Sequence, residues 1–136
     1  ITRIEEIDKG EWVGYDPVFV APEKCRIGTI AVGYSDGYVR GLSDKGQVSI
    51  RGTRAPIRGI ICLDQCMVDL TNIPEAEVND EVLLFGVGLK QNISVNELAD
   101  KVQTNRNEIL SVISRRVPRV YMRDSQVVDV VDYLLD

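Results

Sequence analysis

The fold class is decided by residues 47–70, which read QVSIRGTRAPIRGIICLDQCMVDL. Polar and apolar residues alternate over residues 47–50, as in a half-buried strand, and Arg51-Gly52 then supplies a tight turn. Residues 57–62 and 66–70 predict two more strands. The three residues between these strands are too few for anything but a turn or a bulge, so the two strands should be neighbours.

The segments around this stretch extend the same pattern. Residues 26–33 and 81–87 are apolar and rich in β-forming side chains, which predicts a strand in each. Pro56 has no backbone N–H to donate to a neighbouring strand, so we expect residues 53–57 to form an edge strand or an irregular one. Several short strands at this spacing are typical of a β-barrel or a β-sandwich, and the fold class is therefore mainly β.

One or two short α-helices are expected after these strands. Ser94 and Glu97 form a capping-box pattern, and the apolar residues that follow recur on one helix face, which predicts a helix at about 94–102. A weaker version of the same pattern predicts a second helix at about 106–114. The chain then favours a closing hairpin between residues 117 and 131.

The composition limits both the size of the protein and its chemistry. The 136 residues, of which 44% are hydrophobic and 27% are charged, suit one globular domain and exclude two enzymatic domains. The absence of histidine excludes Ser-His-Asp and Cys-His nucleophile pairs and histidine-based metal sites. A net charge of -5 argues against unaided binding to nucleic acid or to an anionic membrane. We expect neither a metal nor a nucleic-acid partner.

Two groups of residues invite a chemical interpretation, and each has a simpler one. Cys62 and Cys66 resemble half of a zinc or redox site, but no second ligand pair exists, so two small buried thiols are favoured. An odd number of cysteines without a signal-like segment favours reduced thiols. The only basic cluster is Arg115, Arg116, Arg119 and Arg123. A solvated or ion-paired surface is a better explanation of it than a phosphate site.

Residues 33–38, Gly-Tyr-Ser-Asp-Gly-Tyr, are more unusual, because they place two tyrosines and an aspartate around glycines after an apolar strand. Glycine allows a sharp turn there, which would leave the phenols facing open space or a partner chain. A purely structural turn is the alternative. Tyr15, which precedes Asp16-Pro17, is another aromatic residue in an extended segment and is uninformative alone.

Taken together, these stretches resemble the C-terminal domain of the alanine racemase family of pyridoxal 5'-phosphate (PLP) enzymes. The matching stretches, in the family's order and near its spacing, are residues 14–15, 27–30, 33–38, 54–57, 62–67, 80–82 and 116–119. The resemblance implies that residues 1–136 form one β-barrel-like domain and that the PLP-binding (β/α)8 barrel domain is absent from this chain. It also implies a homodimer, in which this domain completes the active site held in the barrel domain of the other subunit.

The resemblance assigns the central chemistry to Tyr15. Racemisation takes the Cα proton from one face of a PLP-bound amino acid and returns a proton on the other face, so two acid–base groups are required. The family uses the PLP-binding lysine on one face and a tyrosine at the position of Tyr15 on the other. A free tyrosine is only about 0.1% ionised at pH 7, so a cation in the absent domain must stabilise its phenolate. This chain is expected to be inactive alone.

Supporting roles follow from the same resemblance. Tyr34 and Arg40 match residues that line the entrance for substrate near the dimer interface and restrict it to small amino acids. Leu63 stands where the family usually has Met, whose backbone N–H helps to hold the substrate carboxylate. Asp64 and Gln65 match the pair that follows, which supports the local backbone.

Asn107 is the main departure from the family. Many alanine racemases have at this position a tyrosine that contacts the cofactor phosphate and walls the substrate pocket. An amide here opens volume and can bind a hydroxyl, which favours serine beside alanine. Ile60 also replaces an arginine found at the outer entrance in some members. In this pattern the chain resembles the serine racemases of the vancomycin-resistance type.

We therefore expect a racemase that interconverts L- and D-serine or L- and D-alanine for peptidoglycan precursors. It would act in the cytoplasm, either as a free protein or as the cytoplasmic domain of a membrane-anchored one. Two alternatives remain open. One is a non-catalytic β-barrel interaction module, and the other is a racemase-like domain retained for dimerisation or regulation. The presence of Tyr15, Tyr34, Arg40 and Asp64 argues mildly against the second.

Overall fold

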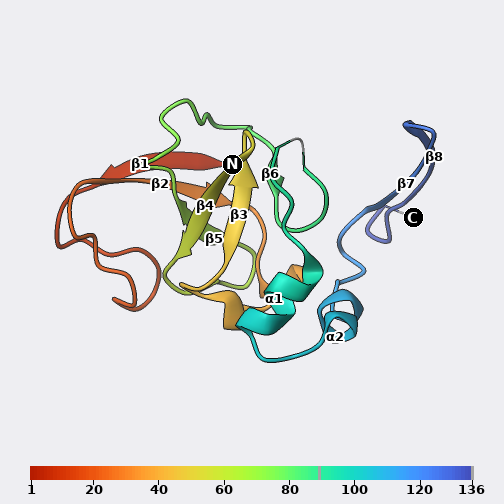
Figure 1. The fold of residues 1–136 in the computed structure, drawn as a ribbon, viewed down its shortest axis with the longest axis horizontal. Coiled ribbons are helices and arrows are strands. Elements are labelled where there is room, and N and C mark those ends of the chain that lie inside the picture. Colours follow the sequence, from red (N-terminus) through yellow and green to blue (C-terminus); the bar gives the residue numbers. More distant parts are fainter. Residues whose placement is uncertain (89, 136) are drawn as a thin grey trace.

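The main body of the protein is a single antiparallel sheet (Figure 1), as seen in a computed structural model that describes residues 1–88 and 90–135. Its strands are β1 (Arg3–Ile7), β2 (Cys25–Ile30), β3 (Gln47–Ile50), β4 (Thr53–Arg58), β5 (Cys66–Asp69) and β6 (Val82–Leu83). Their order in the sheet is β1-β2-β5-β4-β3-β6. The mainly β class expected from the sequence is confirmed, although β6 is much shorter than residues 81–87.

The two ends of this strand order are tied together. The Ile1 amino group donates a hydrogen bond to the Asp80 carbonyl at 2.8 Å, and the Asn79 N–H donates to the Ile1 carbonyl at 2.8 Å. These bonds bring the start of β1 to the residues just before β6, so the sheet curls round its core like a barrel. The core side chains are fully or almost fully buried; the largest are Ile27, Leu42, Ile50, Ile57, Ile61, Leu70, Ile73, Ile93 and Ile109.

The hairpin that joins β3 to β4 has the tight turn expected from the sequence. Arg51 has a φ of 49° and Gly52 a φ of 79°. Positive φ at both central residues is the geometry of a type I′ turn, whose twist matches that of paired strands. The Arg51 guanidinium also binds Asp80 through Nε at 2.6 Å and thereby fixes the turn that precedes β6.

Pro56 lies where β4 has a partner on one side only, which agrees with the edge character expected there, although β4 as a whole is an interior strand of the sheet. β4 pairs with β3 over residues 53–56 and with β5 over residues 57–58. The Ile57 N–H donates to the Gly46 carbonyl at 2.9 Å on the β3 side. The nitrogen of Pro56, one residue earlier, therefore faces the opposite side, where pairing with β5 has not yet begun. The proline removes no ladder hydrogen bond, so β4 is an interior strand.

Two short helices follow the sheet, as expected: α1 (Val95–Lys101) and α2 (Arg106–Ser111). The Ser94 hydroxyl caps α1 by accepting from the Glu97 N–H at 3.1 Å. α2 ends at Ser111, earlier than the expected 114, because residues 112–114 leave the helix and pack against the loop after β2. The Ser114 N–H, for example, donates to the Asp36 carbonyl at 3.1 Å.

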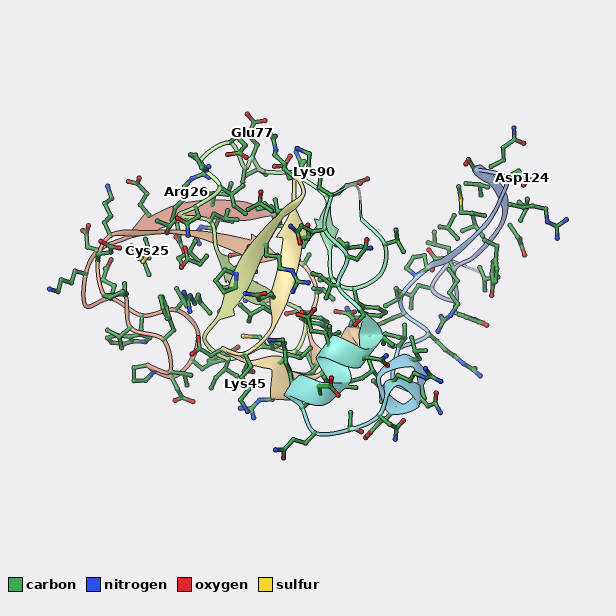
Figure 2. All side chains as sticks on the ribbon, in the orientation of Figure 1. Cys25, Arg26, Lys45, Glu77, Lys90 and Asp124 are labelled. Atoms are coloured by element: carbon green, nitrogen blue, oxygen red, sulfur yellow. The ribbon has the colours of Figure 1, made fainter. Side chains whose placement is uncertain are left out.

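β7 (Arg119–Arg123) and β8 (Gln126–Val131) form a separate hairpin, which confirms the one expected from the sequence. Figure 1 shows this hairpin extending away from the sheet, and Figure 2 shows Asp124 at its tip, far from the body. Its apolar side chains are half exposed or more: Val120, Tyr121, Met122, Val127, Val128 and Val130. Among the described residues, no helix has the length and apolar character needed to cross a membrane.

The core should therefore keep its stability without the hairpin. Deleting residues 120–136 is expected to shift the midpoint of thermal unfolding of this chain by less than about 2 °C, because the hairpin buries little apolar area against the core. Ile57→Ala is the matched control, since it empties a fully buried position and should cost about 2–5 kcal/mol. Calorimetry on the three proteins provides the comparison. A drop on deletion as large as that of the control would show that the hairpin shares the core.

Candidate functional site

The connection between β4 and β5, residues 59–65, lies between the two other loops that carry candidate residues. On one side it meets the long β1–β2 connection, where a Cβ added to Gly59 would lie 2.7 Å from the Val13 carbonyl oxygen. On the other side it meets the segment after β2, where the Tyr34 N–H donates to the Cys62 carbonyl at 3.1 Å. The fold therefore gathers most of the candidate residues around one connection.

Tyr15 lies on the β1–β2 connection, and its side chain is 83% exposed. The preceding Gly14 has a φ of 85°, and a Cβ there would lie 3.3 Å from Met67 Cε, so the backbone passes close to β5 just before the tyrosine. Tyr15 borders a cleft of about 480 Å³ together with Cys62, Gln65 and Trp12. No described residue forms a hydrogen bond with the Tyr15 hydroxyl. The backbone next to Tyr15 is thus fixed by packing, while its phenolic hydroxyl is exposed.

Gly33 is the closest point between the loop after β2 and the β4–β5 connection. A Cβ at this position would lie 2.3 Å from the Cys62 carbonyl oxygen, 2.4 Å from the Leu63 carbonyl oxygen and 2.5 Å from the Asp64 nitrogen. These distances are too short for any side chain, so only glycine fits. The contact aligns the next two residues for hydrogen bonding to Cys62 and Leu63.

The two tyrosines of residues 33–38 have different environments. Tyr34, in a 3₁₀ turn at Tyr34–Asp36, is partly exposed, as expected. Tyr38 is only 3% exposed and packs in the core, so the expectation that it faces open space or a partner is wrong. Its hydroxyl has no hydrogen-bond partner within the described part of the chain, and burial raises the pKa of Tyr38 above its ordinary value. The sequence of residues 33–38 did not show that Tyr38, and not Tyr34, enters the core.

Arg40 begins a second 3₁₀ turn, Arg40–Leu42, which is fixed to the same connection. Its carbonyl accepts from the Ser43 hydroxyl at 2.6 Å, and the Ser43 oxygen accepts from the Ile61 N–H at 2.9 Å. Burial and the charge of Asp64 raise the pKa of the Cys62 thiol, against a smaller opposing effect of Arg40.

The three cysteines are buried and free. Burial raises the pKa of Cys66 to about 12, with a further contribution from Cys62. Both thiols therefore favour the protonated form, which is the wrong form for a nucleophile or a metal ligand. No group of three or more Cys, Asp or Glu side chains that could hold a metal ion occurs among the described residues. These observations support the interpretation of Cys62 and Cys66 as buried thiols.

The turn at Leu63, Asp64 and Gln65 is exposed and tightly held from one side. The Leu63 carbonyl accepts from both the N–H and the hydroxyl of Ser35, at 2.9 and 2.7 Å. The Gln65 carbonyl accepts from the Cys62 N–H at 2.9 Å. The backbone N–H groups of Leu63 and Asp64 have no acceptor among the described residues. Two successive amides of this kind are able to bind a carboxylate.

Asn107 is the candidate residue that the described contacts do not bring to this cluster. It is exposed in the first turn of α2, and its N–H donates to the Asn105 side chain at 3.0 Å as part of the helix cap. α2 reaches the cluster through the residues that follow it, near Ser114. Among the described residues, no hydrogen bond links Asn107 to Tyr15 or Leu63.

Sequence reasoning noted Asp36 only as part of residues 33–38, gave Ser35 no role, and placed Arg116 in a surface cluster. The Arg116 Nε lies 3.0 Å from Asp36 Oδ1, and its Nη1 donates to the Ser35 hydroxyl at 2.9 Å. Asp36 Oδ2 also accepts from the Gly33 N–H at 2.8 Å. Of these contacts, only the bond between Gly33 and Asp36 joins residues close in sequence, as in a short helix cap. The ion-paired interpretation of the cluster is confirmed for Arg116.

Comparison with known proteins finds similarity over most of the chain. The family described as the alanine racemase C-terminal domain matches residues 1–121. The alanine racemase of Halothermothrix orenii is 46% identical over 121 residues, which cover 89% of this chain and 32% of that protein. The chain spans about a third of the length of the curated relatives that it matches.

Solved structures agree with this assignment. The Bacillus anthracis alanine racemase with bound L-Ala-P aligns with a TM-score of 0.93 at 34% identity, over 99% of this chain and 34% of that one. The Bartonella henselae alanine racemase with covalently bound pyridoxal phosphate aligns with a TM-score of 0.81 at 32% identity, over 90% of this chain and 33% of that one. The expected fold, the C-terminal domain of this family with two short helices, is confirmed.

The close approach at Gly33 can be tested by substitution. Gly33→Ala is expected to lower the free energy of unfolding by about 1–3 kcal/mol, because the added Cβ must push apart two backbone segments. In spectra of the backbone amides, the largest shifts should fall on residues 33–37 and 62–65. A variant that unfolds like the unaltered chain and leaves these amides unmoved would contradict the close packing.

Proposed function

This chain belongs to the alanine racemase C-terminal domain family, and on that basis we propose that it completes the active site of a PLP-dependent amino-acid racemase. The observation that carries the proposal is Tyr15, an exposed phenol that borders the same cleft as Cys62 and Gln65. No lysine lines this cleft within the described residues, and in this proposal the second acid–base group is a lysine from outside the chain. A (β/α)8 barrel domain of the other subunit in a homodimer would supply it.

The described residues suit a surface that lines one side of a PLP site, whereas the main contacts to PLP would come from another domain. The Tyr15 hydroxyl and the amides of Leu63 and Asp64 form no hydrogen bond with any described residue, as expected for groups that meet a ligand held by another domain. PLP, when bound there, supplies an electron sink for the charge left on the substrate Cα. The barrel domain would also supply the lysine and most of the phosphate contacts.

Tyr15 would move a proton at its phenolic oxygen on one face of the substrate. Because its hydroxyl has no partner among the described residues, its ionised form would need a cation contributed by the barrel domain. The Leu63 and Asp64 amides would hold the substrate carboxylate, which fixes the Cα in reach of Tyr15. Tyr34 and Arg40, on loops bonded to the same connection, would narrow the entrance to small amino acids.

We propose alanine as the main substrate and serine as a second substrate. The relatives compared above are named alanine racemases, whereas acceptance of serine is what the resemblance to the vancomycin-resistance type implies. The residue that supports serine is Asn107, whose amide can bind a hydroxyl and whose small size leaves room for one. An interaction module without catalysis is the competing function, and it requires that Tyr15 be dispensable.

The two-domain form, in which this domain is joined to a barrel domain of the family and loaded with PLP, provides the test. In D₂O it should exchange the Cα proton of L-alanine, whereas residues 1–136 alone should not. Tyr15→Phe is expected to slow exchange of the L-substrate by about 100-fold or more, because the phenyl ring has no proton to move. Tyr121→Phe, in the hairpin, is the matched control and should leave exchange unchanged. Equal exchange by the Tyr15 variant would favour the interaction module.

The serine hypothesis has its own test in the same two-domain form. Asn107→Tyr is expected to lower the ratio of kcat/KM for serine to that for alanine by about tenfold or more, because the ring fills the volume and removes the amide. Asn107→Ala separates the two causes, since it removes the amide without filling the space. An unchanged ratio in both variants would remove serine specificity from the proposal and leave the racemase assignment standing.

A further inference from the structure

We propose that Ser35, Asp36 and Arg116 form a clamp that sets how tightly the Leu63 turn holds the substrate carboxylate. We call these three residues the Arg116 clamp. The inference rests on the proposed function, because it concerns the same amides of Leu63 and Asp64. It adds three positioning residues that touch neither substrate nor cofactor and act only through the backbone of the turn.

The clamp begins at the guanidinium of Arg116, which holds two side chains at once. Its Nε lies 3.0 Å from Asp36 Oδ1, and its Nη1 donates to the Ser35 hydroxyl at 2.9 Å. The planar fork of an arginine fixes both partners in one geometry, which a lysine ammonium cannot do. The Asp36 side chain is 13% exposed and that of Arg116 is 45% exposed. Loss of Arg116 would therefore leave a mostly buried carboxylate without its cation.

The second step passes from the clamp to the turn. Ser35 donates to the Leu63 carbonyl through its N–H at 2.9 Å and through its hydroxyl at 2.7 Å. These two bonds occupy both lone pairs of the carbonyl oxygen. The neighbouring Tyr34 N–H donates to the Cys62 carbonyl at 3.1 Å. Two consecutive carbonyls of the turn are thus held toward the loop after β2.

The third step follows from the geometry of the peptide bond. In a planar trans peptide the N–H points away from the preceding C=O. With the Cys62 and Leu63 carbonyls drawn toward residues 34–35, the N–H groups of Leu63 and Asp64 must point away from them. These are the two amides without an acceptor among the described residues. The Ser35 bonds therefore turn the Asp64 amide away from the loop after β2, and the adjacent Tyr34 bond does the same for the Leu63 amide.

The clamp also connects the turn to the segment after α2. The Ser114 N–H donates to the Asp36 carbonyl at 3.1 Å, and a Cβ added to Gly37 would lie 2.5 Å from the Val112 carbonyl oxygen. Arg116 follows directly on this segment. Its neighbour Arg115 instead lies over the Tyr133 ring, 5.5 Å from the centroid, and its side chain forms no hydrogen bond or ion pair with Ser35 or Asp36. The two adjacent arginines therefore form a natural pair of test and control.

The test uses the PLP-loaded two-domain form and measures kcat and KM for L-alanine, together with Ki for propionate. Propionate keeps the carboxylate of alanine and lacks its amino group, so its binding reports the carboxylate contact. Arg116→Met and Ser35→Ala are each expected to raise KM and Ki together by about fivefold or more, with kcat changed less than about threefold. Arg116→Lys should recover part of the loss, and Arg115→Met should behave like the unaltered enzyme.

A double variant separates the clamp from independent effects. Because Arg116 is proposed to act through Ser35, the variant with both changes should be little worse than the worse single variant. A fall in kcat and thermal midpoint without a matching rise of Ki would indicate a merely structural role and overturn the clamp. Ser35→Ala removes only one oxygen, so it tests the clamp even if the Arg116 variant fails to fold.

The outcome also distinguishes the clamp from the function on which it rests. If the unaltered form exchanges the Cα proton and Tyr15→Phe abolishes exchange, unchanged Ki values in the clamp variants would overturn the clamp alone. If the unaltered two-domain form fails to exchange, the proposed function falls and the clamp falls with it.

Discussion

The site depends on one steric constraint, the contact of the Gly33 backbone with the backbone of residues 62–64. The space there is too small for a side chain, since a Cβ would lie 2.3 Å from the Cys62 carbonyl oxygen. This close approach is what allows Tyr34 and Ser35 to donate to successive carbonyls of the turn. The end of β2 is thereby joined to the β4–β5 connection. Without this close approach, the exposed turn would lose its hydrogen bonds to Tyr34 and Ser35.

Around this contact, paired charges add side-chain bonds between parts of the chain that are distant in sequence. Each of four arginines bonds a carboxylate from another part of the chain; the pairs are Arg51–Asp80, Arg54–Glu97, Arg58–Asp69 and Arg116–Asp36. The first three hold the turn before β6, α1 and β5 to the central strands, while the fourth holds the site loops. The Arg54 guanidinium keeps the pKa of Glu97 below its ordinary value, so this carboxylate stays charged to a lower pH than a free glutamate does. The net charge of -5 therefore does not reveal that these four arginines are each paired with a carboxylate.

Local signals predicted the fold well and the site only in part. The cap of α1, the turn at Arg51-Gly52 and the closing hairpin depend on neighbours in sequence, and all three were predicted. The sequence did not show that β4 gains a second partner at Ile57, directly after Pro56, and the orientation of Tyr38 was misjudged because it depends on the core. Arg116 and Ser35 are 81 residues apart, so no local pattern could pair them. The roles of Tyr15 and Leu63 came from the family resemblance and stay predictions.

When a domain supplies only part of a binding site, its groups should already be ordered before the other domain binds. Exposed groups on a mobile loop would lose conformational freedom when the site assembles and would bind more weakly. Here the turn at Leu63 is exposed on the side of its free amides and bonded on the opposite side by Ser35 and Tyr34. Its ordering therefore belongs to the folding of this domain. One face of this short turn is held by hydrogen bonds from Ser35 and Tyr34 to its carbonyl groups. The opposite face keeps two amide N–H groups available for a ligand.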